Sequence, residues 1–265
     1  MTGAKQFAGK IVVVTGAAGG IGQALCRHLA GEGAAIGALD RSSPVLGFAD
    51  ALRAEGVAAE GRVVDIADAE ATRQAVAGVR ARLGPIDVLI NNAGFSGRPT
   101  LARTDPAGWR NDVEGNLGGA YHCLHAVIDE MVERRKGSIV NVGSVNALGA
   151  LGDPAYSAAK AGIVSLTRAI ALEYGRYGIR ANVVLPGTVR TPIWQERVAR
   201  DPQVLKTLER WYPLGRIVEP VEVARVIAFL ASDAASAITG AALPVDCGLT
   251  AGNLVMAREL TLEDF

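Results

Sequence analysis

The chain has 265 residues, of which 49% are hydrophobic and 20% charged, so we expect a large buried core rather than intrinsic disorder. Basic and acidic residues both number 27, and this balance argues against binding nucleic acid or anionic membranes through bulk positive charge. No uncharged stretch exceeds 16 residues, and the three scattered cysteines match neither a disulfide framework nor a zinc cluster. These features predict a cytoplasmic protein with no metal site and no nucleic-acid or membrane partner.

Short apolar runs alternate along the chain with longer alanine-rich stretches of helical spacing. Seven runs are candidate strands, at residues 11–14, 34–39, 57–64, 86–90, 138–142, 181–185 and 241–245. Most are apolar throughout, as strands are when both faces of a parallel sheet are covered. Helices are predicted between them, at about residues 20–32, 45–55, 68–83, 104–134, 155–177 and 220–232. This alternation predicts a doubly wound, Rossmann-type α/β fold, with a seven-stranded parallel sheet between two layers of helices.

No linker or internal repeat interrupts the series, so we expect a single domain over residues 1–265. Two segments depart from the alternation. Residues 187–218 form an insertion after the sixth strand that contains Trp194, Trp211 and Tyr212, and such insertions cover ligands in open α/β sheets. Residues 249–265 form a tail that either frays or docks on a neighbouring subunit.

A glycine-rich turn follows the first predicted strand and opens the first helix. It reads T-G-A-A-G-G-I-G, with Gly16, Gly20 and Gly22 in a T-G-x-x-x-G-x-G pattern. Glycines let a pyrophosphate approach the helix N-terminus, whose free N–H groups and dipole favour anions. The turn is therefore a candidate dinucleotide-binding loop, the alternative being a purely structural turn.

The second predicted strand ends at Asp40. A carboxylate at this place can accept hydrogen bonds from the ribose hydroxyls of adenosine and would repel a 2′-phosphate. The glycine-rich turn has no basic residue at Ala17 or Ala18 to receive that phosphate, although Arg41 follows Asp40 directly. The pattern favours NAD over NADP, the alternative being that Asp40 only caps the next segment.

Tyr156 and Lys160 stand four residues apart in a predicted helix, and hence on one face of it. A nearby ammonium favours the tyrosinate form, and a phenol made more acidic can act as general base in alcohol oxidation and general acid in ketone reduction. The Y-x-x-x-K pattern alone is common by chance. Here it follows a strand that ends at Ser144, after all the other motifs in order.

In this order the motifs resemble those of the short-chain dehydrogenase/reductase family, over about residues 7–248. The N-N-A-G segment at residues 91–94 and the P-G pair at residues 186–187 belong to the match. The resemblance implies that Asn116, Ser144, Tyr156 and Lys160 are the catalytic residues. It also implies that the dinucleotide is bound by Gly16, Gly19, Gly20, Ile21, Gly22, Asp40, Asp65, Ile66, Asn92, Ala93, Gly94, Tyr156, Lys160, Pro186, Gly187, Val189 and Thr191.

The resemblance further implies a role for each catalytic residue. Tyr156 would exchange a proton with the substrate oxygen, and Ser144 would hydrogen-bond that oxygen. Lys160 would lower the pKa of Tyr156 and hold the nicotinamide ribose. Asn116 would hold a water that links Lys160 to solvent.

Substrate contacts are expected from Ser144, Asn146, Tyr156, Arg98 and Trp194. This mixture suits a sugar, a polyol or a carbonyl compound with an acid group near Arg98 or Arg190; alternatively, those arginines are solvated or paired with glutamates. We therefore predict an NAD-dependent secondary-alcohol dehydrogenase. The alternatives are a 3-oxoacyl thioester reductase that uses NADPH and a non-catalytic dinucleotide-binding regulatory protein. By resemblance we expect a homotetramer or homodimer, although the small residues at 118–120 and 158–162 could equally serve packing within one chain.

Overall fold

The computed structural model describes residues 5–264. Within this range seven parallel strands form one sheet in the order β3-β2-β1-β4-β5-β6-β7. Their bounds are β1 Ile11–Thr15, β2 Ala35–Asp40, β3 Ala59–Val63, β4 Val88–Asn91, β5 Gly137–Val142, β6 Ile179–Pro186 and β7 Ala242–Val245. The strand order reverses direction between β1 and β4, which defines the switch point of a doubly wound sheet. The predicted fold class is confirmed.

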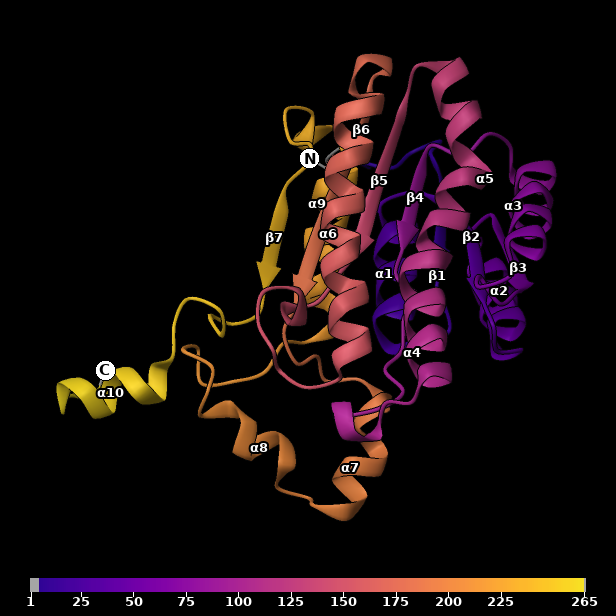
Figure 1. Cartoon of the computed structure of the whole chain (residues 1–265). Coiled ribbons are helices and arrows are strands. Elements are labelled where there is room, and N and C mark those ends of the chain that lie inside the picture. The colour runs from indigo at the N-terminus through magenta and orange to yellow at the C-terminus, as the bar shows by residue number, and fades with distance from the viewer. Residues whose placement is uncertain (1–4, 265) are drawn as a thin grey trace.

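Helices cover both faces of the sheet (Figure 1). The main ones are α1 Gly20–Gly31, α2 Pro44–Ala54, α3 Ala69–Leu83, α4 Pro106–Val113, α5 Gly119–Arg134, α6 Pro154–Tyr174 and α9 Pro220–Ala231. One apolar cluster joins α1, α2 and α9 to the sheet, and a second joins α3 and α5 to its other face. Within β1, Val12 and Val14 belong to the first cluster and Val13 to the second. Side chains of a strand alternate between faces, so a strand buried on both sides is apolar throughout.

The predicted helix at 104–134 is interrupted. Residues Glu114–Gly118 form a π-helical turn between α4 and α5. The ring of Phe95 lies against Gly115, where a Cβ atom would come within 2.4 Å of Phe95 Cε1. The widened turn also lets the Asn116 side chain donate to the carbonyl oxygens of Phe95 and Asp112. The spacing of apolar residues does not reveal such a turn, because its contacts are with Phe95, in a loop distant in sequence.

The insertion at 187–218 carries two short helices, α7 Gln195–Arg200 and α8 Val204–Glu209, that were not predicted. A β-bridge between Val189 and Val218 closes the base of the insertion. In Figure 1 the insertion lies at the end of the sheet to which the strand arrows point. A further helix, α10 Leu254–Thr261, lies in the tail and stands away from the sheet. No helix within residues 5–264 is long and apolar enough to cross a membrane.

The close approach of α1 to the loop after β1 can be tested at Gly22. A Cβ atom at Gly22 would lie 2.1 Å from the carbonyl oxygen of Gly16, so Gly22→Ala should lower the free energy of unfolding by about 1–3 kcal/mol. Gly31 ends the same helix with nothing within 4 Å of its Cβ position, so Gly31→Ala should leave that energy unchanged or raise it by up to about 1 kcal/mol. Urea denaturation of both variants measures the difference, and equal stabilities would contradict the packing described.

Candidate active site

The loops that follow the strands meet at one edge of the sheet, because parallel strands present all their carboxyl ends on the same side. The residues that follow β1, β2, β4, β5 and β6 there include most of the predicted site residues. The opposite edge holds the amino ends of the strands. The candidate active site therefore assembles from segments far apart in the sequence.

A groove of about 360 Å³ runs along this edge at the switch point between β1 and β4. Twelve predicted cofactor residues line it: Gly16, Gly19, Gly20, Ile21, Gly22, Asp40, Asp65, Ile66, Asn92, Ala93, Gly94 and Thr191. The groove is also lined by residues for which no cofactor contact was predicted, among them Arg41, Val64, Phe95 and Pro192. Pro186, Gly187 and Val189 do not line the groove. Pro186 ends β6, and Gly187 and Val189 follow it at the same edge. The groove is thus formed largely by the residues that the motifs indicated.

Polar contacts join the ends of β1 and β4 beside the groove. Thr15 Oγ1 accepts the backbone N–H groups of Asn92 and Ala93, each at 3.0 Å. The Asn92 side chain donates to the carbonyl oxygens of Thr15 at 2.9 Å and Gly16 at 3.1 Å. Gly16 has a φ of +64°, which a residue with a side chain rarely adopts. These contacts hold the glycine loop in one conformation.

The groove has the donor and acceptor groups that a dinucleotide requires. Gly19, the N-cap residue of α1, provides no capping side chain, so the first N–H groups of the helix are accessible to a pyrophosphate. At the groove wall, Asp40 accepts the backbone N–H of Ala18 at 3.0 Å and both the N–H and the hydroxyl of Ser42 at 2.9 and 2.6 Å. Arg41 lies over the Phe95 ring, 4.9 Å from its centroid. The lining therefore fits an adenine dinucleotide.

The four predicted catalytic residues come together beside the groove. Tyr156 and Lys160 lie on α6, and Ser144, directly after β5, hydrogen-bonds Tyr156. Lys160 donates to the carbonyl oxygen of Val142 at 2.8 Å, and its ammonium lies 5.4 Å from the centroid of the Tyr156 ring. A Cβ atom at Gly94 would lie 2.8 Å from Asn116 Oδ1 and 2.9 Å from Lys160 Nζ. Gly94 therefore leaves the space in which Asn116 and Lys160 approach each other.

Burial dominates the electrostatics of Tyr156 and Lys160. It raises the pKa of Tyr156 above its usual value. The hydrogen bond with Ser144 lowers that pKa, and the nearby Asp153 raises it further. Burial also lowers the pKa of Lys160 to about 8. We expected Lys160 to lower the pKa of Tyr156. The combined effect of the surroundings of Tyr156 is instead to raise that pKa. Desolvation of the phenol outweighs the ammonium, which is itself made less basic by the same burial.

A buried chain of side-chain hydrogen bonds fixes α6 against the sheet. Asn91 of β4 donates to Asn141 Oδ1 of β5 at 2.9 Å, and Asn141 donates to Thr167 Oγ1 of α6 at 2.8 Å. Sequence reasoning assigned no role to Asn141 or Thr167. The polar Asn141 inside an otherwise apolar strand was the available signal, since buried amides need partners.

The predicted substrate residues have unequal freedom. Asn146 is engaged by its neighbours, since Oδ1 accepts from Ser144 at 3.3 Å and Nδ2 donates to Ser157 at 3.0 Å. Arg190 forms an ion pair with Glu219 at 2.8 Å, in agreement with the alternative that this arginine is paired with a glutamate. Trp194 is flanked by the Arg197 guanidinium, 4.7 Å from the ring centroid. Arg98 is exposed and forms no ion pair in the part of the chain that the structure describes. Contact of these residues with substrate stays a prediction.

The chain matches known proteins over nearly its whole length. The family model adh_short_C2, described as enoyl-(acyl carrier protein) reductase, matches residues 16–250. An oxidoreductase of Schizosaccharomyces pombe, described as uncharacterized, is 43% identical over 259 residues, which cover 97% of this chain and 96% of that protein. The cis-4-hydroxycyclohexanecarboxylate dehydrogenase of Sinomonas cyclohexanicum is 42% identical over 250 residues, which cover 93% of this chain and 99% of that protein.

A solved structure agrees with these matches. The crystal structure of a short-chain dehydrogenase/reductase family oxidoreductase from Burkholderia thailandensis aligns with a TM-score of 0.91 and 51% identity, over 97% of this chain and 98% of that one. The chain therefore belongs to the short-chain dehydrogenase/reductase family. It is an oxidoreductase of a family that uses a nicotinamide dinucleotide.

The lowered pKa of Lys160 has a measurable consequence for stability. Its value falls from 10.5 to about 8 on folding, so between these limits the unfolded chain binds more protons at this residue than the folded chain does. Stability should therefore rise with pH above about pH 8, by up to about 1.4 kcal/mol per pH unit. The Lys160→Met variant should lack this contribution.

Urea denaturation of both proteins between about pH 7 and pH 10 tests this prediction. The range stops there because the raised pKa of Tyr156 has the opposite effect: above about pH 10 the unfolded chain loses a proton that the folded chain retains. Equal slopes for the wild type and Lys160→Met would show that Lys160 is not desolvated.

Proposed function

We propose that this protein is an NAD-dependent secondary-alcohol dehydrogenase acting on a polar hydroxylated substrate. One observation carries the proposal: Ser144, Tyr156 and Lys160 meet beside a dinucleotide-sized groove whose wall presents the Asp40 carboxylate. A proton-transfer group is thus placed next to the space for a hydride carrier. The interconversion of a secondary alcohol and a ketone requires these two elements.

In the proposed mechanism the chain positions both reactants and moves one proton. The glycine loop and the N-terminus of α1 hold the pyrophosphate, and Lys160 holds the nicotinamide ribose. When bound, the nicotinamide supplies hydride acceptance and donation at the carbinol carbon. Tyr156 takes the hydroxyl proton in oxidation and returns it in reduction. Ser144 donates a hydrogen bond to the reacting oxygen, which stabilises the negative charge that develops there.

The pKa shifts of Tyr156 and Lys160 suit a reversible proton transfer. Its raised pKa keeps Tyr156 protonated at neutral pH, which is the form that donates a proton to a ketone. Lys160, with a pKa of about 8, is still largely protonated at neutral pH, and its positive charge favours tyrosinate when the alcohol is oxidised. The same pair of residues can therefore serve both directions.

Two features of the groove support NAD as the cofactor. The Asp40 carboxylate is held at the groove wall by three hydrogen bonds, where it can accept from a ribose hydroxyl and repel a 2′-phosphate. Arg41, the nearest cation in sequence, is stacked on Phe95 instead of pairing with Asp40. A 2′-phosphate would have to draw Arg41 away from this stack.

Arg98 supports a substrate that bears an acid group. Arg190 is paired with Glu219, so Arg98 is the better anchor of the two predicted arginines. The carbonyl oxygen of Pro99, the residue after Arg98, accepts the N–H of Asp153 at 3.1 Å, which places this loop beside the start of α6 and hence near Tyr156. The relative from Sinomonas cyclohexanicum is named for a hydroxycarboxylate, a secondary alcohol that carries such a group. Sugars and polyols remain in the proposed substrate class.

A second candidate is a thioester reductase that uses NADPH. The description of the matching family model, which names an acyl-carrier-protein substrate, favours it. The Asp40 carboxylate opposes it through repulsion of the 2′-phosphate. A non-catalytic regulatory role is disfavoured, because Asn116, Ser144, Tyr156 and Lys160 are all present and assembled.

An initial-rate screen by NADH absorbance tests the proposed function. The panel contains sugars, polyols, hydroxy acids, aliphatic and aryl secondary alcohols, and 3-hydroxyacyl thioesters, with NAD and then NADP as the oxidant. We expect activity with NAD on one polar class, and a loss of at least about 100-fold in kcat for Tyr156→Phe, because general acid–base catalysis contributes that much. Activity only with NADP on thioesters would favour the second candidate, and full turnover by Tyr156→Phe would refute the role of the phenol.

The basis of cofactor choice can be tested at Asp40. The Asp40→Ser variant should lose about 10- to 100-fold in kcat/KM for NAD, the effect of one hydrogen bond to a charged group, and should gain activity with NADP. Asp68→Ser is the matched control, since it removes the same charge but keeps an oxygen to cap α3 outside the groove. An unchanged ratio of NAD to NADP activity in Asp40→Ser would contradict the assignment.

A further inference from the structure

A second cavity, of about 370 Å³, lies at the edge of the sheet opposite the candidate active site. Its lining comes from the amino ends of β1, β4, β5 and β6 and from the segment after α9. It is as large as the dinucleotide groove and shares no lining residue with it. The function proposed above makes no use of it.

The cavity has more positive than negative charge. Its ionisable lining residues are Lys10, Asp87, Lys136, Arg180 and Asp233. Lys10 forms an ion pair with Asp233 at 2.8 Å. Asp87 forms an ion pair at 2.5 Å with Arg134, which is not part of the cavity lining. The Lys136 ammonium is 4.0 Å from Asp87 and its side chain is 60% exposed. These pairings satisfy both carboxylates and leave Lys136 and Arg180 in excess.

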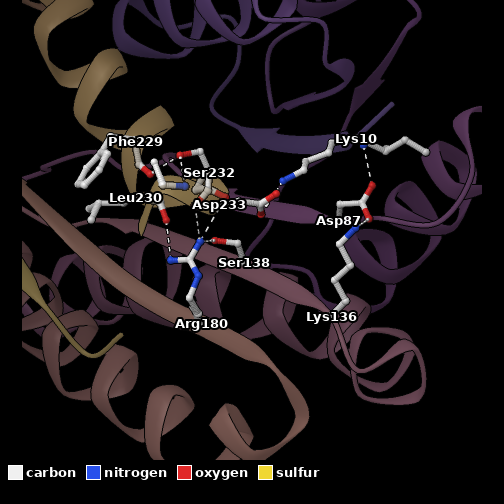
Figure 2. A network of polar contacts seen from close by, with 12 residues as sticks. Lys10, Asp87, Lys136, Ser138, Arg180, Phe229, Leu230, Ser232 and Asp233 are labelled. Atoms are coloured by element: carbon white, nitrogen blue, oxygen red, sulfur yellow. Dashed lines mark hydrogen bonds and ion pairs between the residues drawn. The ribbon is translucent and has the colours of Figure 1, made fainter. Parts of the chain in front are cut away.

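Arg180 is a half-buried cation that is oriented without being neutralised. Its Nη1 donates to the carbonyl oxygens of Leu230 at 2.8 Å and Ile238 at 3.2 Å. Its Nη2 donates to the carbonyl oxygens of Ala231 at 3.4 Å and Ser232 at 2.9 Å and to Ser138 Oγ at 3.3 Å. It forms no ion pair within residues 5–264. Figure 2 shows this arrangement, with Asp233 turned toward Lys10. These carbonyl groups fix the position of the cation. Burial lowers the pKa of Arg180, and the nearby Asp233 carboxylate, which raises that pKa, offsets the effect of burial only in part.

Three hydroxyl-bearing residues add hydrogen-bonding capacity to the same cavity. Ser138, Ser236 and Thr239 belong to its lining. Because Ser138 Oγ accepts from Arg180, its own hydrogen is free to be donated. Ammonium, guanidinium and hydroxyl donors around a cavity of excess positive charge form a set that recognises oxyanions.

We propose that this cavity is a second ligand site, which binds a small dianion through Lys136, Ser138 and Ser236, beside the positive charge of Arg180. The ligand chemistry is that of a phosphate group or a dicarboxylate. A dianion there balances the two cations in excess. Because Arg180 holds the end of α9, and α9 packs on the dinucleotide helix α1, ligation also stabilises the fold.

Isothermal titration calorimetry with inorganic phosphate, and separately with malonate, tests the site at constant ionic strength. We expect saturable binding of one anion per chain, with a rise in Tm, and the stronger of the two ligands identifies the class. Lys136→Gln should weaken binding about tenfold, the effect of losing one charge-assisted hydrogen bond, and Ser236→Ala should weaken it less. Lys5→Gln, an exposed lysine outside the cavity, should bind as the wild type does.

The glycine loop at α1 is the competing place for an anion, and the variants separate the two sites. Binding that is equal in the wild type and Lys136→Gln, or that disappears when saturating NADH is present, would locate the anion at α1 and overturn the proposal. Absence of saturable binding by both anions would overturn it as well. Arg180 is left unchanged in these experiments because its removal would release the end of α9 and change the fold itself.

Discussion

The position of α6 depends on the buried hydrogen-bond chain from Asn91 through Asn141 to Thr167. Buried amides and hydroxyls are costly when unpaired, so a displacement of the helix that broke these bonds would be unfavourable. Tyr156 and Lys160 are on that helix, and the Lys160 bond to the Val142 carbonyl adds a second constraint at the end of β5. The position of the candidate proton-transfer site therefore depends on contacts made in the core.

The parallel sheet gives its two edges different chemistry. At the carboxyl edge the loops are rich in glycine and small residues, which leaves backbone N–H groups and space for a dinucleotide. At the amino edge the chain places two lysines, one arginine and two aspartates around a cavity. Arg180 belongs to β6 and hydrogen-bonds the end of α9. The carboxyl end of β6 leads into the segment that contributes Thr191 to the dinucleotide groove. The two sites are thus connected through the same strand and helix.

Burial has opposite consequences for the two groups of the catalytic pair. It raises the pKa of Tyr156 and lowers that of Lys160 to about 8, so burial shifts each group toward its neutral form. The sequence argument considered the attraction of the phenolate to the ammonium and to the oxidised nicotinamide, and not the loss of water, and therefore expected the opposite direction for Tyr156. The shift depends on how much water is excluded from both groups, and neighbouring residues in sequence do not reveal that.

Local patterns in the sequence were sufficient for the fold class, the glycine loop, the position of Asp40 at the end of β2 and the spacing of Tyr156 and Lys160. The fold class follows from the alternation of strand and helix patterns along the chain. The other features depend on residues within one strand–turn–helix unit, where periodicity and glycine placement act directly. Only the tertiary structure decided the π-helical turn at Asn116, the pairing of Arg190 with Glu219 and the engagement of Asn146. These features arise from contacts between segments distant in sequence, and their energies depend on burial and on partners that no local pattern specifies.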